Sequence, residues 1–270
     1  MVTTIAIAQC GYPADGDVTA QVERWLAVAA GAGASLVVFP EDLMSPSRLT
    51  PSELRDLAEP LEGPFVKSIR RACRGYGVWS VVTFYECNPV GGAPYNTAVL
   101  IDASGEVRGT YRKCHLYDAH GVLESERNTP GDTLFTPVEA PFGKLGLGIC
   151  YDLRFPEVVR AAAIAGCQLF VFPSAWHDGP HKVSHWETLL RARAIENELF
   201  VVGACRAGER YTGRSLVANP LGNVLVRANG KDEELLVCDI DQDEVLGARE
   251  AMPVLDHRHS ELYHALSGVE

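Results

Sequence analysis

The segment from Lys144 to Glu157 reads KLGLGICYDLRFPE. Its first half, Leu145–Cys150, is small and apolar and predicts a buried strand. Pro156, which is favourable in the first turn of a helix, then opens an apolar stretch that runs to Ala165. A cysteine at this junction faces the positive end of a helix dipole, and that position favours a thiolate. Taken alone, a cysteine at the end of an apolar strand is more often a buried structural thiol.

Outward from this segment, runs rich in Val, Ile, Leu and Phe recur and predict further buried or half-buried strands. These runs are Thr4–Ala8, Leu36–Phe39, Trp79–Phe84, Ala98–Ile101, Leu169–Phe172, Phe200–Ala204, Ser215–Ala218 and Leu235–Asp239. Helices are predicted at Val18–Ala30, Pro64–Gly75, Pro156–Ala165 and Lys182–Glu196, and a short one follows the capping-box sequence Thr50-Pro51-Ser52-Glu53. Tyr95–Arg112 and Arg214–Val226 predict hairpins.

Strands and helices that alternate, mixed with hairpins, predict an α/β fold. The pattern fits one mixed sheet or two sheets with helices on their outer faces, and it does not choose between them. With 270 residues and 47% hydrophobic content, we expect one domain spanning residues 1–270. The stretch Ala251–Tyr263 is polar and contains proline, so we expect it to lie against another surface, such as a partner subunit.

The composition of the chain argues against several kinds of binding partner and site. The 24 basic and 35 acidic residues give a net charge of −11 without a dense Lys/Arg run, so nucleic acid is not expected. No apolar stretch is long enough to cross a bilayer, and Met1–Gln9 lacks the features of a secretion signal, so we expect a cytoplasmic protein that does not bind membranes. The eight cysteines form no C-x-x-C pair, which argues against a disulfide framework and a cysteine-rich zinc site.

Two charged residues also follow apolar strands. Glu41 ends the run Val37–Glu41, and carboxyl ends of strands are where α/β sheets bind ligands. A partly desolvated carboxylate there can gain a pKa suited to proton transfer. Lys113 follows Tyr111 and Arg112. Taken alone, Glu41 reads as an exposed loop acid and Lys113 as a solvated surface lysine.

Together, Phe39–Glu41, Tyr111–Lys113 with His115-Leu116, and Gly148–Glu157 resemble the three signature segments of nitrilase-superfamily carbon–nitrogen hydrolases, in the same order. The resemblance covers nearly the whole chain, because it extends to Phe172–Ala175, His185–Glu187, Arg191–Asn197 and Asn219–Gly222. It implies a four-layer α-β-β-α sandwich with two mixed sheets, assembled as a homodimer or a higher homo-oligomer. It also implies an amidase that needs no cofactor.

The resemblance further implies a role for each matching residue. Cys150 would attack the amide carbonyl and form a thioester, with Glu41 as general base. Lys113 and the backbone N–H of Tyr151 would stabilise the oxyanion. Glu124 matches a second glutamate of the family, which positions the substrate and supports the geometry of the lysine and the cysteine.

Two residues bear on the substrate, which we expect to be a small carboxamide that reacts with water. Arg154 matches an arginine of ω-amidases and deaminated glutathione amidases and would anchor a substrate carboxylate, although an ion pair with Asp152 or Glu157 fits as well. Trp176 is expected to form an aromatic wall of the pocket. Candidate substrates are a dicarboxylate monoamide or an amide like deaminated glutathione. Ser47 stands where ω-amidase-like sequences have a tyrosine, so that hydroxyl is absent.

Other functions remain open at this point. The same three catalytic residues would serve a carbamoyl-amine hydrolase or a nitrilase, and a catalytically silent scaffold is the alternative that involves no enzyme. His177, His181 and His185 are spaced by four residues, which suggests a shared metal ion. Because Gly179-Pro180 interrupts any helix between the first two, we expect structural or pocket-lining histidines and no metal.

Overall fold

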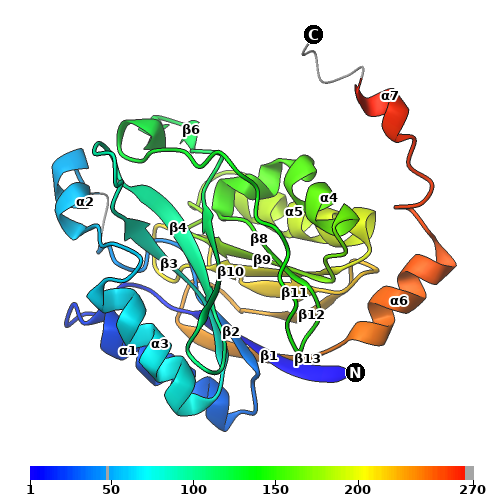
Figure 1. The fold of residues 1–270 in the computed structure, drawn as a ribbon, viewed down its shortest axis with the longest axis horizontal. Coiled ribbons are helices and arrows are strands. Elements are labelled where there is room, and N and C mark those ends of the chain that lie inside the picture. The colour runs from blue at the N-terminus through cyan, green and yellow to red at the C-terminus, as the bar shows by residue number, and fades with distance from the viewer. Residues whose placement is uncertain (47–48, 265–270) are drawn as a thin grey trace.

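The chain forms two β-sheets that lie face to face, with helices on both outer sides (Figure 1). The structure is a computed structural model and describes residues 1–46 and 49–264, so Ser47 and the last six residues of the expected domain lie outside it. The order of the first sheet is β13-β1-β2-β3-β4-β5, and that of the second is β12-β11-β10-β9-β8. Each sheet contains parallel and antiparallel pairs. The predicted sandwich with two mixed sheets is therefore confirmed.

The elements have the following bounds. The first sheet comprises β1 (Val2–Gln9), β2 (Leu36–Val38), β3 (Trp79–Glu86), β4 (Tyr95–Ile101), β5 (Val107–Arg112) and β13 (Glu234–Asp241). The second comprises β8 (Leu145–Leu147), β9 (Leu169–Ser174), β10 (Phe200–Cys205), β11 (Leu216–Ala218) and β12 (Val224–Arg227), and β6 (Asp118–Ala119) pairs with β7 (Val122–Leu123). The α-helices are α1 (Val18–Gly31), α2 (Pro51–Leu57), α3 (Pro64–Tyr76), α4 (Pro156–Ile164), α5 (Lys182–Asn197), α6 (Gln242–Ala251) and α7 (Ser260–His264), and the 3-10 helices are η1 (Glu124–Glu126) and η2 (Cys150–Arg154).

Most of the predicted elements are present. Both hairpins form, as β4 with β5 and as β11 with β12. The capping box is also confirmed, because Thr50 Oγ1 accepts from the Glu53 amide and the Glu53 carboxylate accepts from the Thr50 amide at 2.8 Å. Helix α6 was not predicted. Its only buried residue is Val245, so it lacks the apolar stripe that makes a helix recognisable in a sequence.

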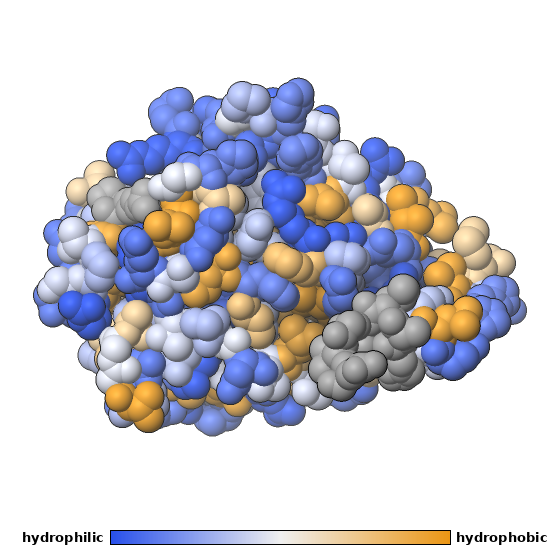
Figure 2. Space-filling model, turned by 90° about the horizontal axis from the view of Figure 1, so that it is seen from above, coloured by the Kyte–Doolittle hydropathy of each residue, from blue (hydrophilic) through white to orange (hydrophobic). Residues whose placement is uncertain are grey.

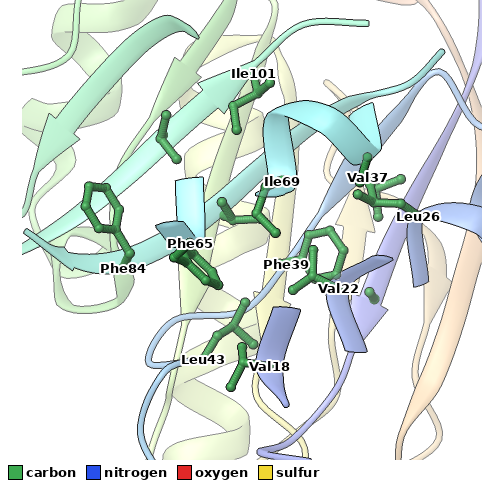
Figure 3. Close-up of a cluster of buried hydrophobic side chains, with 14 of the residues drawn as sticks. Val18, Val22, Leu26, Val37, Phe39, Leu43, Phe65, Ile69, Phe84 and Ile101 are labelled. Carbon is green, nitrogen blue, oxygen red and sulfur yellow. The ribbon is translucent and has the colours of Figure 1, made fainter. Parts of the chain in front are cut away.

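Alternation along the strands divides the core into three clusters. On β1, Ala6 and Ala8 face the helices α1 and α3, whereas Ile5 and Ile7 face the second sheet. Such alternation is the property of a strand buried on both faces. Figure 3 shows the cluster under α1 and α3, in which Phe39 lies among side chains from both helices. The third cluster packs the second sheet against α4 and α5.

The C-terminal part, with α6 and α7, extends away from the two sheets (Figure 1). Leu255 packs partly against the cluster under α4 and α5, while Met252 and Leu262 are exposed. From above, hydrophobic residues occur in small groups among hydrophilic ones (Figure 2). Within residues 1–46 and 49–264, no helix is long and apolar enough to cross a membrane.

Candidate active site

The charged residues singled out in the sequence converge where strands of both sheets end. β2, β3 and β5 run in one direction in the first sheet, and β8, β9 and β10 run in parallel in the second. Glu41 follows β2, Lys113 follows β5, and Cys150 follows β8. Because carboxyl ends of parallel strands meet at one edge of a sheet, residues more than a hundred positions apart line one cavity.

Glu41 is fixed in two ways, by buried neighbours in the sequence and by hydrogen bonds from both sheets. Its neighbours Phe39 and Leu43 are fully buried in the core under α1 and α3 (Figure 3). Its carboxylate accepts from the Asn96 amide at 2.7 Å and from the backbone N–H of Ala175, which follows β9, at 2.8 Å. Sequence analysis missed Asn96, because an asparagine at the start of a strand carries no distinguishing signal.

Lys113 lies between two buried carboxylates. Its Nζ is 2.9 Å from Glu41 Oε1 and 2.9 Å from Glu124 Oε2, and all three side chains are less than a tenth exposed. Glu124 is fixed by the Tyr117 amide at 2.7 Å. Burial acts to lower the pKa of Lys113, but the two carboxylates outweigh it and raise this pKa well above its usual value. Burial also acts to raise the pKa of Glu41, and the Lys113 ammonium holds it below its usual value. Both groups are therefore charged at neutral pH.

Cys150 differs from the sequence prediction in two ways. The strand β8 ends at Leu147, three residues before the cysteine, and Cys150 is the first residue of the 3-10 helix η2 with φ at +46°. Only a few per cent of residues other than glycine adopt this conformation, which places the thiol in the cavity under local strain. The predicted thiolate is wrong. Burial, followed by the charge of Glu41, raises the pKa of the Cys150 thiol well above its usual value, so the resting form is the thiol.

Asp152 joins the segments that carry Lys113 and Cys150, a role the sequence did not reveal. It is fully buried and accepts from Tyr111 Oη at 2.9 Å and from the Ile149 amide at 2.8 Å. Its other oxygen accepts from the His115 amide at 3.2 Å and lies 2.7 Å from His115 Nδ1. The carboxylate thus fixes the turn before the cysteine against the end of β5.

Arg206, also missed in the sequence, connects the second sheet to the loop that carries Glu41. It follows β10, is 2% exposed, and donates to the carbonyl oxygens of Asp42 and Ser45. It also lies 3.0 Å from the carboxylate of Asp42, which lines the cavity beside Glu41. Burial nevertheless raises the pKa of Asp42 to about 6.

The cavity is lined by charged, polar and aromatic side chains, as is usual for the binding site of a small molecule. Tyr151, Arg154 and Trp176 all line it. The guanidinium of Arg154 lies over the Trp176 ring, 4.8 Å from its centroid. Among the residues that the structure describes, Arg154 forms no ion pair with Asp152 or Glu157.

The three histidines do not form one group, although the ring centroids of His181 and His185 lie 6.2 Å apart. His177 lines the cavity and forms a β-bridge with Tyr211, whereas His181 precedes α5 and His185 lies one turn into it. In the described part of the chain, no group of three or more His, Cys, Asp or Glu side chains is arranged to hold a metal ion.

Comparisons with known proteins agree with this geometry. The model of the carbon-nitrogen hydrolase family matches residues 4–250. A Homo sapiens protein named deaminated glutathione amidase is 38% identical over 251 residues, which cover 87% of this chain and 75% of that protein.

Solved structures have the same fold. The Caenorhabditis elegans NitFhit protein superimposes with a TM-score of 0.89 at 33% identity, over 97% of this chain and 66% of that longer chain. A mutant amidase from Nesterenkonia sp. AN1 superimposes with a TM-score of 0.81 at 28% identity, over 97% of this chain and 96% of its own. That amidase carries the acetamide moiety of fluoroacetamide covalently added at its active-site cysteine. The family match and the identity to a relative that is matched over three quarters of its length together show that this chain belongs to the carbon-nitrogen hydrolases of the nitrilase superfamily, enzymes that hydrolyse carbon–nitrogen bonds.

Proposed function

We propose that the protein hydrolyses a small carboxamide to a carboxylate and ammonia through a thioester on Cys150, without a cofactor. The observation that carries the proposal is the buried cluster of Glu41, Lys113 and Glu124 beside this cysteine in one cavity. The covalent adduct at the cysteine of the Nesterenkonia amidase supports a nucleophilic role for the corresponding thiol.

In the first half of the reaction, the thiol proton moves to the Glu41 carboxylate as sulfur attacks the amide carbon. This direction is supported by the charge states, since the resting thiol is protonated and Glu41 is ionised. The resulting oxyanion is stabilised by the Lys113 ammonium and the backbone N–H of Tyr151. The carbon–nitrogen bond then breaks, and Glu41 delivers its proton to the departing ammonia, which leaves a thioester.

In the second half, Glu41 removes a proton from a water molecule, which attacks the thioester carbon. The carbon–sulfur bond breaks, the proton returns to sulfur, and the carboxylic acid leaves. Glu124 acts as a positioning residue throughout, because it holds Lys113 through both of its carboxylate oxygens, at 2.9 and 3.1 Å. Because the resting thiol is neutral, Cys150 becomes nucleophilic when Glu41 accepts its proton as an amide group binds beside it.

Ammonia release from a panel of small carboxamides tests this function. We expect turnover by the wild type and none by Cys150→Ala or Lys113→Ala, with circular dichroism spectra unchanged. Iodoacetamide should label Cys150 faster than the other seven cysteines, all of which are unpaired. Full activity in Cys150→Ala would contradict the thioester mechanism.

The expected substrate carries a carboxylate, which Arg154 would anchor beside the Trp176 ring. A dicarboxylate monoamide and an amide like deaminated glutathione both meet this requirement. The relative named deaminated glutathione amidase supports the second. A nitrile or a carbamoyl amine remains an alternative for the same residues, and paired assays of each with the matching amide would decide between them.

A cytoplasmic homodimer remains our expectation for the whole protein, organised as a single domain of residues 1–270. The eight unpaired cysteines support a reducing compartment. Exposed Leu246 and Met252 near the C-terminus are compatible with a subunit contact. Light scattering of the purified protein measures the oligomeric state directly.

A further inference from the structure

Three cationic side chains line the cavity and have no carboxylate partner among the residues that the structure describes. They are Arg127, Arg154 and Lys182. Within residues 1–46 and 49–264, none of the three has a carboxylate oxygen within 4.0 Å. The chain has 35 acidic and only 24 basic residues, so acidic partners are not scarce. Cations that are held in a partly desolvated cavity without counter-ions indicate that an anionic ligand completes the site.

Two of these cations share one wall. The Arg154 guanidinium lies 4.8 Å and the Lys182 ammonium 5.7 Å from the centroid of the Trp176 ring. Lys182 also donates to Tyr117 Oη at 3.1 Å. This wall contains the carboxylate anchor of the proposed function, and Lys182 adds a second charge to it.

Arg127 lines the same cavity but contacts a different segment of the chain. It follows η1, and its Nη1 donates to the carbonyl oxygen of Leu49, in the segment before α2, at 3.3 Å. Its Nε is buried and has no hydrogen-bond partner. The nearby carboxylate of Asp42 is already bound to Tyr85 and Arg206, so it does not neutralise this guanidinium. The contacts of the guanidinium therefore include one carbonyl oxygen and no carboxylate among the described residues, which leaves donors for an anionic group in the cavity that it lines.

We propose that Arg127 determines specificity by binding a second anionic group of the substrate, away from Arg154 and Lys182. The preferred substrate is then an amide that carries two carboxylates, one at each cationic site, with the scissile carbonyl beside Cys150. This inference rests on the proposed function for the scissile bond. A planar guanidinium suits this task, because it can donate two parallel hydrogen bonds to a carboxylate.

Binding and turnover are measured separately to test the proposal. Calorimetry in a Cys150→Ala background compares butyramide, which is neutral, succinamate, which has one carboxylate, and two amides with two carboxylates. The latter are the monoamide of tricarballylic acid, with both charges on the acyl chain, and N-succinylglycine, with one on the amine. Arg127→Gln is added to this background, and exposed Arg227, which pairs with Glu187, provides the matched control Arg227→Gln.

We expect at least one doubly charged amide to bind tenfold or more tightly than succinamate. Arg127→Gln should weaken that amide by about 10- to 100-fold, while succinamate and butyramide change by less than about threefold. Arg227→Gln should change none of them. Equal weakening of all the ligands would overturn the proposal, because Arg127 would then only hold the segment at Leu49. Absence of any preference for two carboxylates would overturn it as well.

Turnover by the enzyme with Cys150 intact separates the two proposals. If Arg127 governs binding of the doubly charged amide but the wild type releases neither ammonia nor amine from any of the amides, the hydrolytic function fails and the anion site stands. If succinamate is hydrolysed and Arg127→Gln has no selective effect, the hydrolytic function stands and the anion site fails.

Discussion

Replacement of Asp152 by asparagine should destabilise the protein and disturb the active site together. The carboxylate accepts hydrogen bonds on both oxygens, from Tyr111 and the Ile149 amide on one and from the backbone and ring of His115 on the other. An asparagine has only one acceptor oxygen. Whichever way its amide is turned, the NH₂ group faces a backbone N–H, of Ile149 or of His115, so that hydrogen bond is lost and the remaining ones no longer go to a charged acceptor.

Each hydrogen bond to a charged group contributes about 1.5–3 kcal/mol, so we expect Asp152→Asn to lower the free energy of unfolding by roughly 3–5 kcal/mol. The unfolding entropy of about 2.1 cal/mol/K per residue gives about 0.6 kcal/mol/K for this chain, which converts the loss into a decrease in Tm of about 5–9 °C. Activity should fall by roughly tenfold or more, because Cys150 and Lys113 lose their common support and small displacements of reacting groups have large effects on rate.

Differential scanning calorimetry measures the change in Tm, and ammonia release measures the activity. Asp239→Asn is the matched control, because Asp239 is exposed and its carboxylate accepts one hydrogen bond from Thr4. We expect it to change the free energy of unfolding by less than about 0.5 kcal/mol. A decrease in Tm below about 2 °C for Asp152→Asn, or one equal to that of the control, would refute this account of the buried carboxylate.

Three further predictions follow from the site. Cys150→Ser and Glu41→Gln should each abolish turnover, and the double variant should be no worse than either single one, because the two groups act as a unit; additive losses in kcat would contradict this. For Asp42, burial raises the folded-state pKa from 3.8 to about 6, so its contribution to stability is present below pH 4 and is lost as the pH rises through 6. Urea unfolding measures the free energy of unfolding of the wild type minus that of Asp42→Asn, and this difference should fall by up to ~3 kcal/mol between pH 4 and pH 7. A difference that stays constant with pH would show that Asp42 does not titrate in this range. Gly148→Ala should lower the free energy of unfolding by about 1–3 kcal/mol, because a Cβ there would lie 2.8 Å from the Phe172 ring. The control is Gly31→Ala at the end of α1, where a Cβ meets no atom within 4 Å, so this change should be neutral or stabilising. Equal effects of the two changes in thermal melts would argue against tight packing beside the cysteine.

Local signals made much of the fold predictable. Helix α2 was found from its capping box, and both hairpins from their turn residues, because these features depend on residues a few positions apart. Helix α6 was missed, since a helix with one buried residue has no periodic stripe. The strand before Cys150 was predicted three residues too long, because the apolar pattern continues through Ile149 after pairing has ended at Leu147.

Single residues of the site were predictable only where they stood in recognisable segments. Glu41, Lys113 and Cys150 were predicted as one site on the resemblance to a family, and the structure brings them together. Asn96 and Arg206 could not be found in this way. Each acts on a partner more than fifty positions away, and nothing in its own neighbourhood marks it.

By itself, the sequence determined the α/β class, most of the elements and the types of chemically active residue, because these follow from periodicity and from short motifs. Only the tertiary structure decided which strands each sheet contains, that burial disfavours the thiolate, and that three cations share a cavity without counter-ions among the described residues. The physical reason is that burial and the distances between charges depend on which strand ends meet. The residues at these strand ends are far apart in the sequence, and their distance along the chain does not indicate how close they lie in space.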